Sequence, residues 1–351
     1  MLKKLFKALA LFTVISVASF LLFLCYSKNR AFNNFTKPVR TAKENSTLSR
    51  LSDLQTGAQN ASKGQPQVAP TESIKPLGPC PDNPPNLVGP LHVDFKTERN
   101  LDDVRKEIGV PLQEGGRYKP PDCIAKQKVA VIIAFRNRHE HLKHWLYYLH
   151  PILIRQQLDY TVYVINQDGE GIFNRAKLMN AGYMEALKEY DYDCFVFSDV
   201  DLVPMDDRNL YRCFDNPRHL AVGMDKFNFH LPYTTFFGGV SSLSKTQFSK
   251  INGFPNTYWG WGGEDDDIYK RVIFHGMSIS RPNLVIGKYR MVKHNRDLHN
   301  EPNPVNPGKL SKTGQTMGTD GINSLKYTVK TIVKDKLYTF ITVDIDAPPP
   351  H

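Results

Sequence analysis

Several motifs that mark common enzyme and binding-protein classes are missing from this 351-residue chain. It has no Gly-x-Gly-x-x-Gly motif and no P-loop lysine motif, which argues against a dinucleotide-dependent enzyme or an NTPase. No spacing among its five cysteines resembles a zinc site. The formal net charge is +10, but there is no basic stripe interleaved with aromatic residues, so we expect no nucleic-acid partner.

Charged residues are also missing between Ala8 and Ser27. At ~1.5 Å rise per residue, such a helix spans a hydrocarbon core of ~30 Å. Its length favours a retained membrane anchor over a signal peptide, although the small residues at 17–19 leave cleavage open. Lysines before the span predict that residues 1–7 are cytoplasmic and that the rest of the chain is translocated.

Aromatic residues are scarce between residues 28 and 79, where Ser, Thr, Asn, Lys, Gln and Pro dominate. Such a segment has too little apolar surface to fold, so we interpret it as a flexible stem. All the Asn-x-Ser/Thr sequons of the chain lie here, at Asn34, Asn45 and Asn60. The sequence therefore predicts a glycosylated spacer in a secretory compartment.

The cysteines fit the same compartment. Cys25 lies in the predicted membrane span, and an even number remain downstream: Cys80, Cys123, Cys194 and Cys213. Disulfides persist in an oxidising lumen, so these four are predicted to be structural. Their spacing leaves all three pairings open.

Residues 80–351 are enough for one large domain, and their hydrophobic pattern favours one. Apolar runs predict strands at 128–135, 160–167 and from 194 onward, and helical periodicity predicts a helix ending near 157 and another over 174–190. This alternation predicts an α/β fold with a parallel sheet. Ligands of such sheets bind at the carboxyl ends of the strands.

Asp199 and Asp201 end the third strand, with one valine between them. An Asp-x-Asp pair at this edge suits a divalent cation that also bridges to phosphate oxygens. Aspartates equally cap helices and close turns, so the pair alone is ambiguous.

The two preceding strands end in residues suited to a nucleotide diphosphate. They are Phe135, Arg136, Asn137 and Arg138 after the first strand, and Phe173, Asn174 and Arg175 after the second. Guanidinium groups pair with phosphate oxygens, and an aromatic ring can stack on a base. Any one arginine could be an ordinary loop residue, but three beside an Asp-x-Asp pair favour a diphosphate site.

A second dense cluster, YWGWGGEDDD, covers residues 258–267 and precedes a predicted helix. Acidic residues in a first helical turn complement the helix dipole, but four in a row exceed that need. Crowded carboxylates raise one another's pKa, which suits a general base acting on a hydroxyl group. With its glycines and indoles, the segment is interpreted as a mobile lid that carries a base.

Together these residues resemble the β-1,4-galactosyltransferases of the Golgi, over roughly residues 80–344. The motifs that carry the resemblance are FRNR at 135–138, FNRAKL at 173–178, FSDVDLVP at 197–204, NGFPNTYWGWGGEDDD at 252–267 and DGINSL at 320–325. The resemblance implies a GT-A fold behind a membrane anchor and stem. It also implies manganese-dependent, inverting transfer of galactose from UDP-galactose to N-acetylglucosamine.

The resemblance assigns roles that composition would not. It implies that Asp265 is the catalytic base, assisted by Glu264, and that the metal ligands are Asp201, Met291 and His294. It implies disulfides Cys80–Cys123 and Cys194–Cys213. The implied donor-binding residues are Ala134, Phe135, Arg136, Asn137, Arg138, Phe173, Asn174, Arg175, Asp199, Val200, Asp201, Lys226, Trp261 and His294. The implied acceptor-binding residues are Phe227, Tyr233, Phe236, Gly262, Gly263, Glu264, Asp265, Asp266, Asn306, Pro307 and Leu310.

The chain departs from the family pattern around the acceptor. Asn306, Pro307 and Leu310 replace an Arg-Phe pair and an isoleucine, so the fork of the arginine is lost. Phe236 replaces a tyrosine that commonly lines the donor sugar, which predicts looser choice between galactose and N-acetylgalactosamine. Ala134 replaces a proline, with less expected effect.

The implied partners are UDP-galactose, a glycoprotein or glycolipid ending in N-acetylglucosamine, the Golgi membrane and a lactalbumin-like modifier protein. Two alternative functions, each from a different class of protein, stay open. One is a lectin that keeps the sugar site without turnover, which retained metal-dependent UDP binding would reveal. The other is a metal-dependent phosphoesterase, which needs two clustered metal sites where this sequence shows one.

Overall fold

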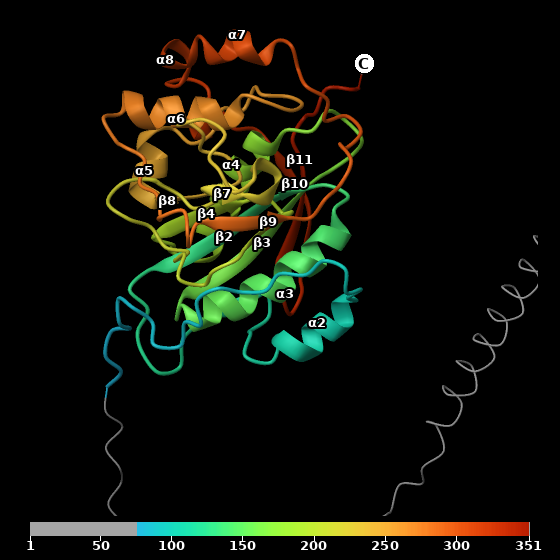
Figure 1. The fold of residues 1–351 in the computed structure, drawn as a ribbon. Helices are drawn as coiled ribbons and strands as arrows, with labels where there is room; N and C mark the ends of the chain where they lie inside the picture. Colours follow the sequence, from blue (N-terminus) through green and yellow to red (C-terminus); the bar gives the residue numbers. More distant parts are fainter. Residues whose placement is uncertain (1–75, 351) are drawn as a thin grey trace, which may run out of the picture. The chain divides into compact units, whose positions relative to one another are not determined.

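A central mixed β-sheet organises residues 76–350, the part of the chain that the computed structural model describes (Figure 1). The predicted cytoplasmic tail, the anchor at 8–27, the three sequons and nearly all of the stem lie outside these residues. Within residues 76–350, no helix is both long and apolar enough to cross a membrane.

The strands are β1 (Arg117–Tyr118), β2 (Lys128–Phe135), β3 (Asp159–Gln167), β4 (Cys194–Ser198), β5 (Leu202–Pro204), β6 (Arg218–His219), β7 (Gly223–Met224), β8 (Val240–Ser244), β9 (Lys288–Met291), β10 (Thr328–Lys334) and β11 (Thr339–Asp344). The α-helices are α2 (Leu101–Ile108), α3 (His139–Arg155), α4 (Arg175–Glu189), α5 (Lys245–Lys250), α6 (Glu264–Phe274), α7 (Asn306–Leu310) and α8 (Thr313–Thr316). Short 3₁₀ turns lie at Asp225–Phe227 and Ile322–Ser324.

The main sheet has the strand order β10-β11-β3-β2-β4-β8-β6, and β1 pairs with β3. Strands β11, β3, β2 and β4 run parallel, so the predicted parallel unit is confirmed. The antiparallel strands β8 and β10 and the small sheet β5-β9-β7 were not predicted from the sequence. That small sheet is important for the site, because it brings β9 beside the end of β4.

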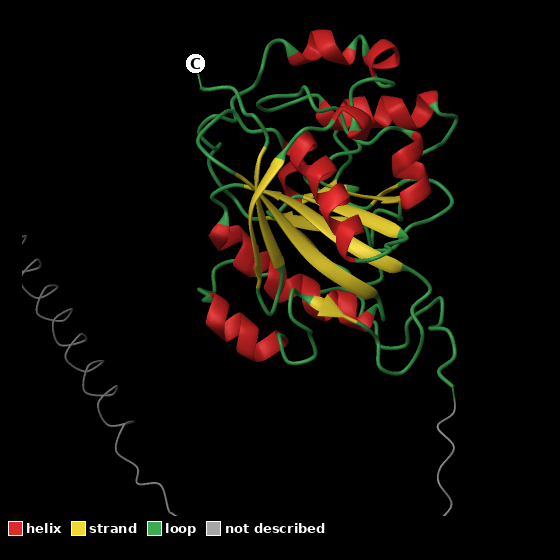
Figure 2. Cartoon of the chain, turned by 180° about the vertical axis from the view of Figure 1, so that it is seen from behind, coloured by secondary structure: helices red, strands yellow, loops and turns green. Residues whose placement is uncertain are grey.

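Helices cover both faces of the sheet (Figures 1 and 2). Alternate residues of β2 point to opposite sides, as pleating requires. Val131 and Ile133 pack with Trp145 and Leu149 of α3 in one core cluster. Ala130 and Ile132 belong to a second cluster with residues of α4, α5 and α6. Burial on both faces explains why β2 reads as a continuous apolar run.

Local capping sets the start of α4. The Asn174 side chain accepts a hydrogen bond from the backbone N–H of Lys177 at 2.8 Å and so satisfies a free donor of the first turn. The helix therefore begins at Arg175, and its first side chain lies at the carboxyl end of β3.

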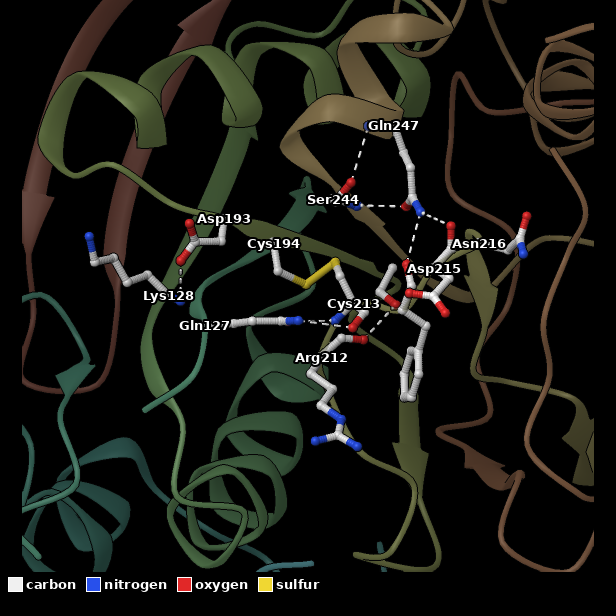
Figure 3. Close-up of a disulfide and its surroundings, with 12 residues drawn as sticks. Gln127, Lys128, Asp193, Cys194, Arg212, Cys213, Asp215, Asn216, Ser244 and Gln247 are labelled. Atoms are coloured by element: carbon white, nitrogen blue, oxygen red, sulfur yellow. Dashed lines mark hydrogen bonds between the residues drawn. A yellow bond between two sulfur atoms is a disulfide. The ribbon is translucent and has the colours of Figure 1, made fainter. Parts of the chain in front are cut away.

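Both disulfides implied by the family resemblance are present, Cys80–Cys123 and Cys194–Cys213. Figure 3 shows the second one, which links the first residue of β4 to the loop before β6. The amide of Gln127 adds two hydrogen bonds to the backbone of Cys213, at 2.9 and 3.0 Å. Ser244 and Gln247 form a capping box at the start of α5, and the Gln247 amide donates to the carbonyls of Phe214 and Asp215 in the same loop. The loop is thus held to the amino end of the sheet.

Candidate active site

Two adjoining cavities lie at the carboxyl ends of the parallel strands. One, of about 260 Å³, is lined by residues that follow β2, β3 and β4. The other, of about 490 Å³, lies between the first turn of α6 and the segment leading into α7. Four residues belong to both linings: Phe236, Trp261, Glu264 and Asp265. The two cavities therefore meet at this shared wall.

Arg175 organises the carboxylates of the shared wall. Its Nε donates to Asp199 at 2.6 Å, and its Nη1 donates to Asp265 at 2.8 Å. Glu264 lies 3.7 Å from the same Nη1. Burial disfavours the charged guanidinium, but the nearby carboxylates outweigh it and raise the pKa of Arg175. The prediction that Arg175 contacts a diphosphate is untested, and Arg175 lines the smaller cavity. Within the chain it hydrogen bonds to two carboxylates and lies near a third.

Burial raises the pKa of two of the carboxylates near Arg175, Glu264 and Asp199. It raises the pKa of Glu264, and the charge of Asp265 raises it further against the opposing effect of Arg175. Burial also raises the pKa of Asp199, where Arg175 opposes the shift. The predicted crowding of acidic groups at this turn is therefore present, and it is accompanied by a raised pKa at Glu264.

Asp265 packs against Gly238, a position with no room for a side chain. A Cβ atom at Gly238 would lie 2.3 Å from Oδ2 of Asp265. One Asp265 oxygen therefore faces Gly238 and the other accepts from Arg175. Gly263, two residues before Asp265, is the N-cap of α6 with φ 94°, a conformation that residues other than glycine rarely adopt.

The other two acidic residues of this turn have different partners. Asp266 accepts from the hydroxyl of Tyr233 at 2.9 Å and lines the larger cavity. Asp267 is buried and pairs with Arg271 at 2.6 Å. It also accepts from the hydroxyls of Tyr258 and Thr313. Asp267 thus belongs to the protein interior.

The three implied metal ligands come together in the smaller cavity. Leu202, which follows Asp201, pairs with Met291 across β5 and β9, and Val292 donates its N–H to the Asp201 carbonyl. His294 Nε2 lies 2.9 Å from Asp201 Oδ2, and this hydrogen bond raises the pKa of the imidazole. Among residues 76–350, no group of three or more His, Cys, Asp or Glu side chains is arranged to hold a metal. An imidazole, a carboxylate and a thioether nevertheless line one cavity, so this donor set fits a divalent ion that keeps open positions for a ligand.

Arg136 and Arg138 connect the end of β2 to the segment that carries His294. Arg138 donates to the Asn295 carbonyl at 3.0 Å, contacts His294 Nδ1 at 2.9 Å and pairs with Asp297. Arg136 donates to the carbonyls of Gly171 and Leu298. Its guanidinium also lies 5.0 Å from the centre of the Phe173 ring. These arginines line the cavity but are also hydrogen bonded within the chain.

Three residues that depart from the family pattern, Asn306, Pro307 and Leu310, line the larger cavity. Asn306 is almost fully buried, and its Nδ2 donates to the Gly262 carbonyl at 2.8 Å. It therefore supports the backbone of the glycine-rich segment. Pro307 and Leu310 complete this wall. Phe236 packs edge-on against Phe227 and Tyr233 where the two cavities meet.

The structure brings most of the predicted site residues to the two cavities. Lining the smaller cavity are Ala134, Arg136, Arg138, Phe173, Arg175, Asp199, Val200, Asp201, Lys226, Phe227, Met291 and His294, besides the shared wall. Lining the larger are Tyr233, Gly262, Gly263, Asp266, Asn306, Pro307 and Leu310. Three predicted donor residues lie outside both linings. Phe135 packs in the core, Asn174 caps α4, and Asn137 lines a neighbouring depression.

Several residues that line these cavities were not predicted from the sequence. They are His141, Met224, Gly239, Asp297 and Asn300 in the smaller one, and Pro302, Asn303 and Pro304 in the larger. His141 lies in the first turn of α3, directly after the FRNR motif, and that position could have indicated it. The others come from loops and from the small sheet, for which the hydrophobic pattern gave no signal.

Comparison with known proteins identifies relatives of the whole described domain. Residues 80–214 match the N-terminal region of glycosyl transferase group 7, and residues 218–295 match the N-terminal domain of galactosyltransferase. The chain is 60% identical to mouse β-1,4-galactosyltransferase 1 over 80% of this chain and 70% of that protein. It is 59% identical to mouse β-1,4-galactosyltransferase 2 over 82% of this chain and 79% of that protein.

Solved structures agree with this similarity. The catalytic domain of Drosophila β1,4-galactosyltransferase 7 in complex with xylobiose matches with a TM-score of 0.55 and 28% identity. The match covers 63% of this chain and 94% of that one. A mutant of the same Drosophila enzyme, in complex with manganese, UDP-Gal and xylobiose, matches equally well.

Proposed function

Because the chain belongs to the β-1,4-galactosyltransferase family, we propose that it transfers galactose from UDP-galactose to the 4-hydroxyl of terminal N-acetylglucosamine. The predicted GT-A fold agrees with the fold of its structural relatives. The smaller cavity, with its arginines and Asp201, is suited to the donor. The larger one, with its aromatic and acidic lining, is suited to the acceptor sugar.

One observation carries this proposal: the Asp265 carboxylate lies in the wall that the two cavities share. An acceptor hydroxyl that enters from the larger cavity meets this carboxylate before it reaches the donor. Asp265 takes the hydroxyl proton as the oxygen attacks the anomeric carbon. The bond between that carbon and the diphosphate breaks, UDP leaves from the opposite side, and the configuration inverts.

Arg175 acts as a positioning residue in this step. It holds one Asp265 oxygen through Nη1 while the contact with Gly238 fixes the other side of the carboxylate. Both constraints reduce the freedom of the base before substrate arrives, which is the source of orientation effects in catalysis.

Asp201, Met291 and His294 would hold a divalent ion, which we propose to be manganese. When bound, the ion supplies positive charge that neutralises the leaving diphosphate. The His294 segment is fastened to the end of β2 through Arg138. Metal binding at His294 and the position of this segment are therefore coupled.

The cellular setting belongs to the same proposal. Residues 8–27 act as a signal anchor in the Golgi membrane, and residues 28–79 as a glycosylated stem that carries a lumenal catalytic domain. The acceptor is a glycoprotein or glycolipid that ends in N-acetylglucosamine. A lactalbumin-like modifier is a partner to test, through a change of acceptor preference towards glucose.

The test is sugar transfer by the full chain, with UDP-galactose and a benzyl N-acetylglucosaminide, in manganese or in EDTA. We expect a manganese-dependent disaccharide whose β-1,4 linkage is identified by NMR. Asp191→Asn, a change at an exposed carboxylate far from the site, serves as a matched control and should keep full activity. Manganese-dependent UDP binding without any product would favour the lectin reading, and release of inorganic phosphate from UDP would favour a phosphoesterase.

A further inference from the structure

A third cavity, of about 500 Å³, lies at the opposite edge of the sheet from the candidate active site. Its lining includes Gln127 and Leu158, which directly precede β2 and β3, and Cys213 of the disulfide to β4. The catalytic cavities lie at the carboxyl ends of these strands. This cavity is therefore a separate site.

Basic side chains outnumber acidic ones in its lining. Lys126, Arg212 and Arg218 face Asp82 and Asp215, an excess of one positive charge. Asp82 pairs with Lys126 at 2.6 Å and lies 3.6 Å from Arg212. Arg218, in contrast, forms no ion pair with any residue of the described range 76–350.

Arg218 is also incompletely hydrogen bonded. Its Nε is buried and finds no partner within the part of the chain that the structure describes. Burial and the charge of Arg212 both lower its pKa, which shows that the surroundings disfavour this cation. Arg218 as a whole is partly buried, and leaving its buried Nε without a hydrogen-bond partner has a cost that a ligand can offset.

Both arginines line this cavity and lie close to the same aromatic ring. The guanidinium carbon of Arg218 lies 4.1 Å from the centre of the Phe214 ring, and that of Arg212 lies 5.3 Å from it. Figure 3 shows Arg212 directed away from the Cys194–Cys213 disulfide. Gln157 contributes a buried Oε1 without a partner among residues 76–350, an acceptor for a hydroxyl group.

We propose that this cavity binds a phosphomonoester through Arg212 and Arg218. A tetrahedral dianion offers several oxygens to two guanidinium forks, and it provides the charge that Arg218 lacks. A bare ion would leave much of the volume empty. The lining also contains Pro81, Pro84 and Leu158, which suit a small organic body on the ester. Such an ester is either a soluble metabolite or the headgroup of a lipid.

The test is calorimetric titration of the full chain with three probes: inorganic phosphate, glycerol 3-phosphate and dihexanoyl phosphatidic acid. Saturating UDP and manganese are present throughout, to occupy the cavity at the other edge. We expect glycerol 3-phosphate to bind more tightly than phosphate, and Arg218→Gln to weaken it at least tenfold. Tighter binding of the short-chain lipid than of glycerol 3-phosphate would identify a lipid headgroup as the source, and the reverse order a soluble ester.

The control is Lys250→Gln, which removes one exposed positive charge outside the cavity and should leave the affinity unchanged. Arg218→Lys keeps the charge without the fork and should give an intermediate affinity. Denaturant unfolding checks that each variant is folded before titration. Equal affinities for the native chain and the folded Arg218→Gln variant, or no binding of any probe at millimolar concentration, would overturn the proposal. Neither result depends on sugar transfer.

Discussion

The first turn of α6 contains four consecutive acidic residues that serve two different regions of the molecule. Glu264 and Asp265 turn towards Arg175 and the junction of two cavities. Asp267, three positions after Glu264, turns into the interior and pairs with Arg271. The comparison shows that composition alone does not separate a carboxylate that lines a cavity from one that supports the interior. What separates them is the partner of each carboxylate and whether the carboxylate borders a cavity.

The largest expected effect comes from Asp265→Asn. The amide keeps the shape of the side chain but cannot take a proton, so we expect kcat to fall by about 10²–10⁴. Arg175 keeps its pair with Asp199 and the amide oxygen can still accept from Nη1, so the free energy of unfolding should change by less than about 1 kcal/mol. Steady-state kinetics and urea unfolding of the same sample check both parts. Activity within threefold of the native chain would remove Asp265 as the base.

Asp267→Asn should show the opposite pattern. It leaves Arg271 buried without its carboxylate, and breaking such a pair costs about 3–5 kcal/mol of unfolding free energy. The variant should still transfer galactose, with kcat per folded molecule within about twofold of native because Asp267 lines neither cavity. A large loss of kcat in fully folded protein would contradict the assignment of Asp267 to the interior alone.

Glu264→Gln tests the electrostatics of the cavity half. Burial raises the folded-state pKa of Glu264, so the folded chain keeps a proton that the unfolded chain releases. The stabilisation is complete below the usual glutamate pKa and is lost as pH rises through the raised value. Each affected pH unit costs about 1.4 kcal/mol of unfolding free energy. Between pH 5 and pH 8, the unfolding free energy of the variant, measured in urea, should not show this fall with pH. If the native chain and the variant gave parallel curves of unfolding free energy against pH, Glu264 would not be the group responsible.

The sequence predicted those parts of the molecule that local patterns control. The apolar runs at 128–135 and 160–167 correspond to β2 and β3, because strands buried on both faces are apolar throughout. The acidic first turn of α6 was also predicted, since its residues are adjacent in the chain. The hydrophobic pattern alone did not predict that Met291 and His294 lie beside Asp201. That contact depends on the pairing of β5 with β9, two short strands almost 90 residues apart.

The smallest effect is expected at Phe236, which belongs with Asp265 to the wall that the two cavities share. Its ring lines both cavities and packs against Tyr233, so it can influence the donor sugar as well as the acceptor. A tyrosine hydroxyl here would add a polar group that favours one sugar over the other, whereas phenylalanine offers only an apolar edge. We therefore expect appreciable transfer from UDP-N-acetylgalactosamine by the native chain. Phe236→Tyr should shift the ratio of kcat/KM values towards UDP-galactose by about tenfold, or about 1.4 kcal/mol. Asp265→Asn should lower transfer from both donors equally, because the base acts on the acceptor. Near-exclusive use of galactose by the native chain would mean that Phe236 does not set donor choice.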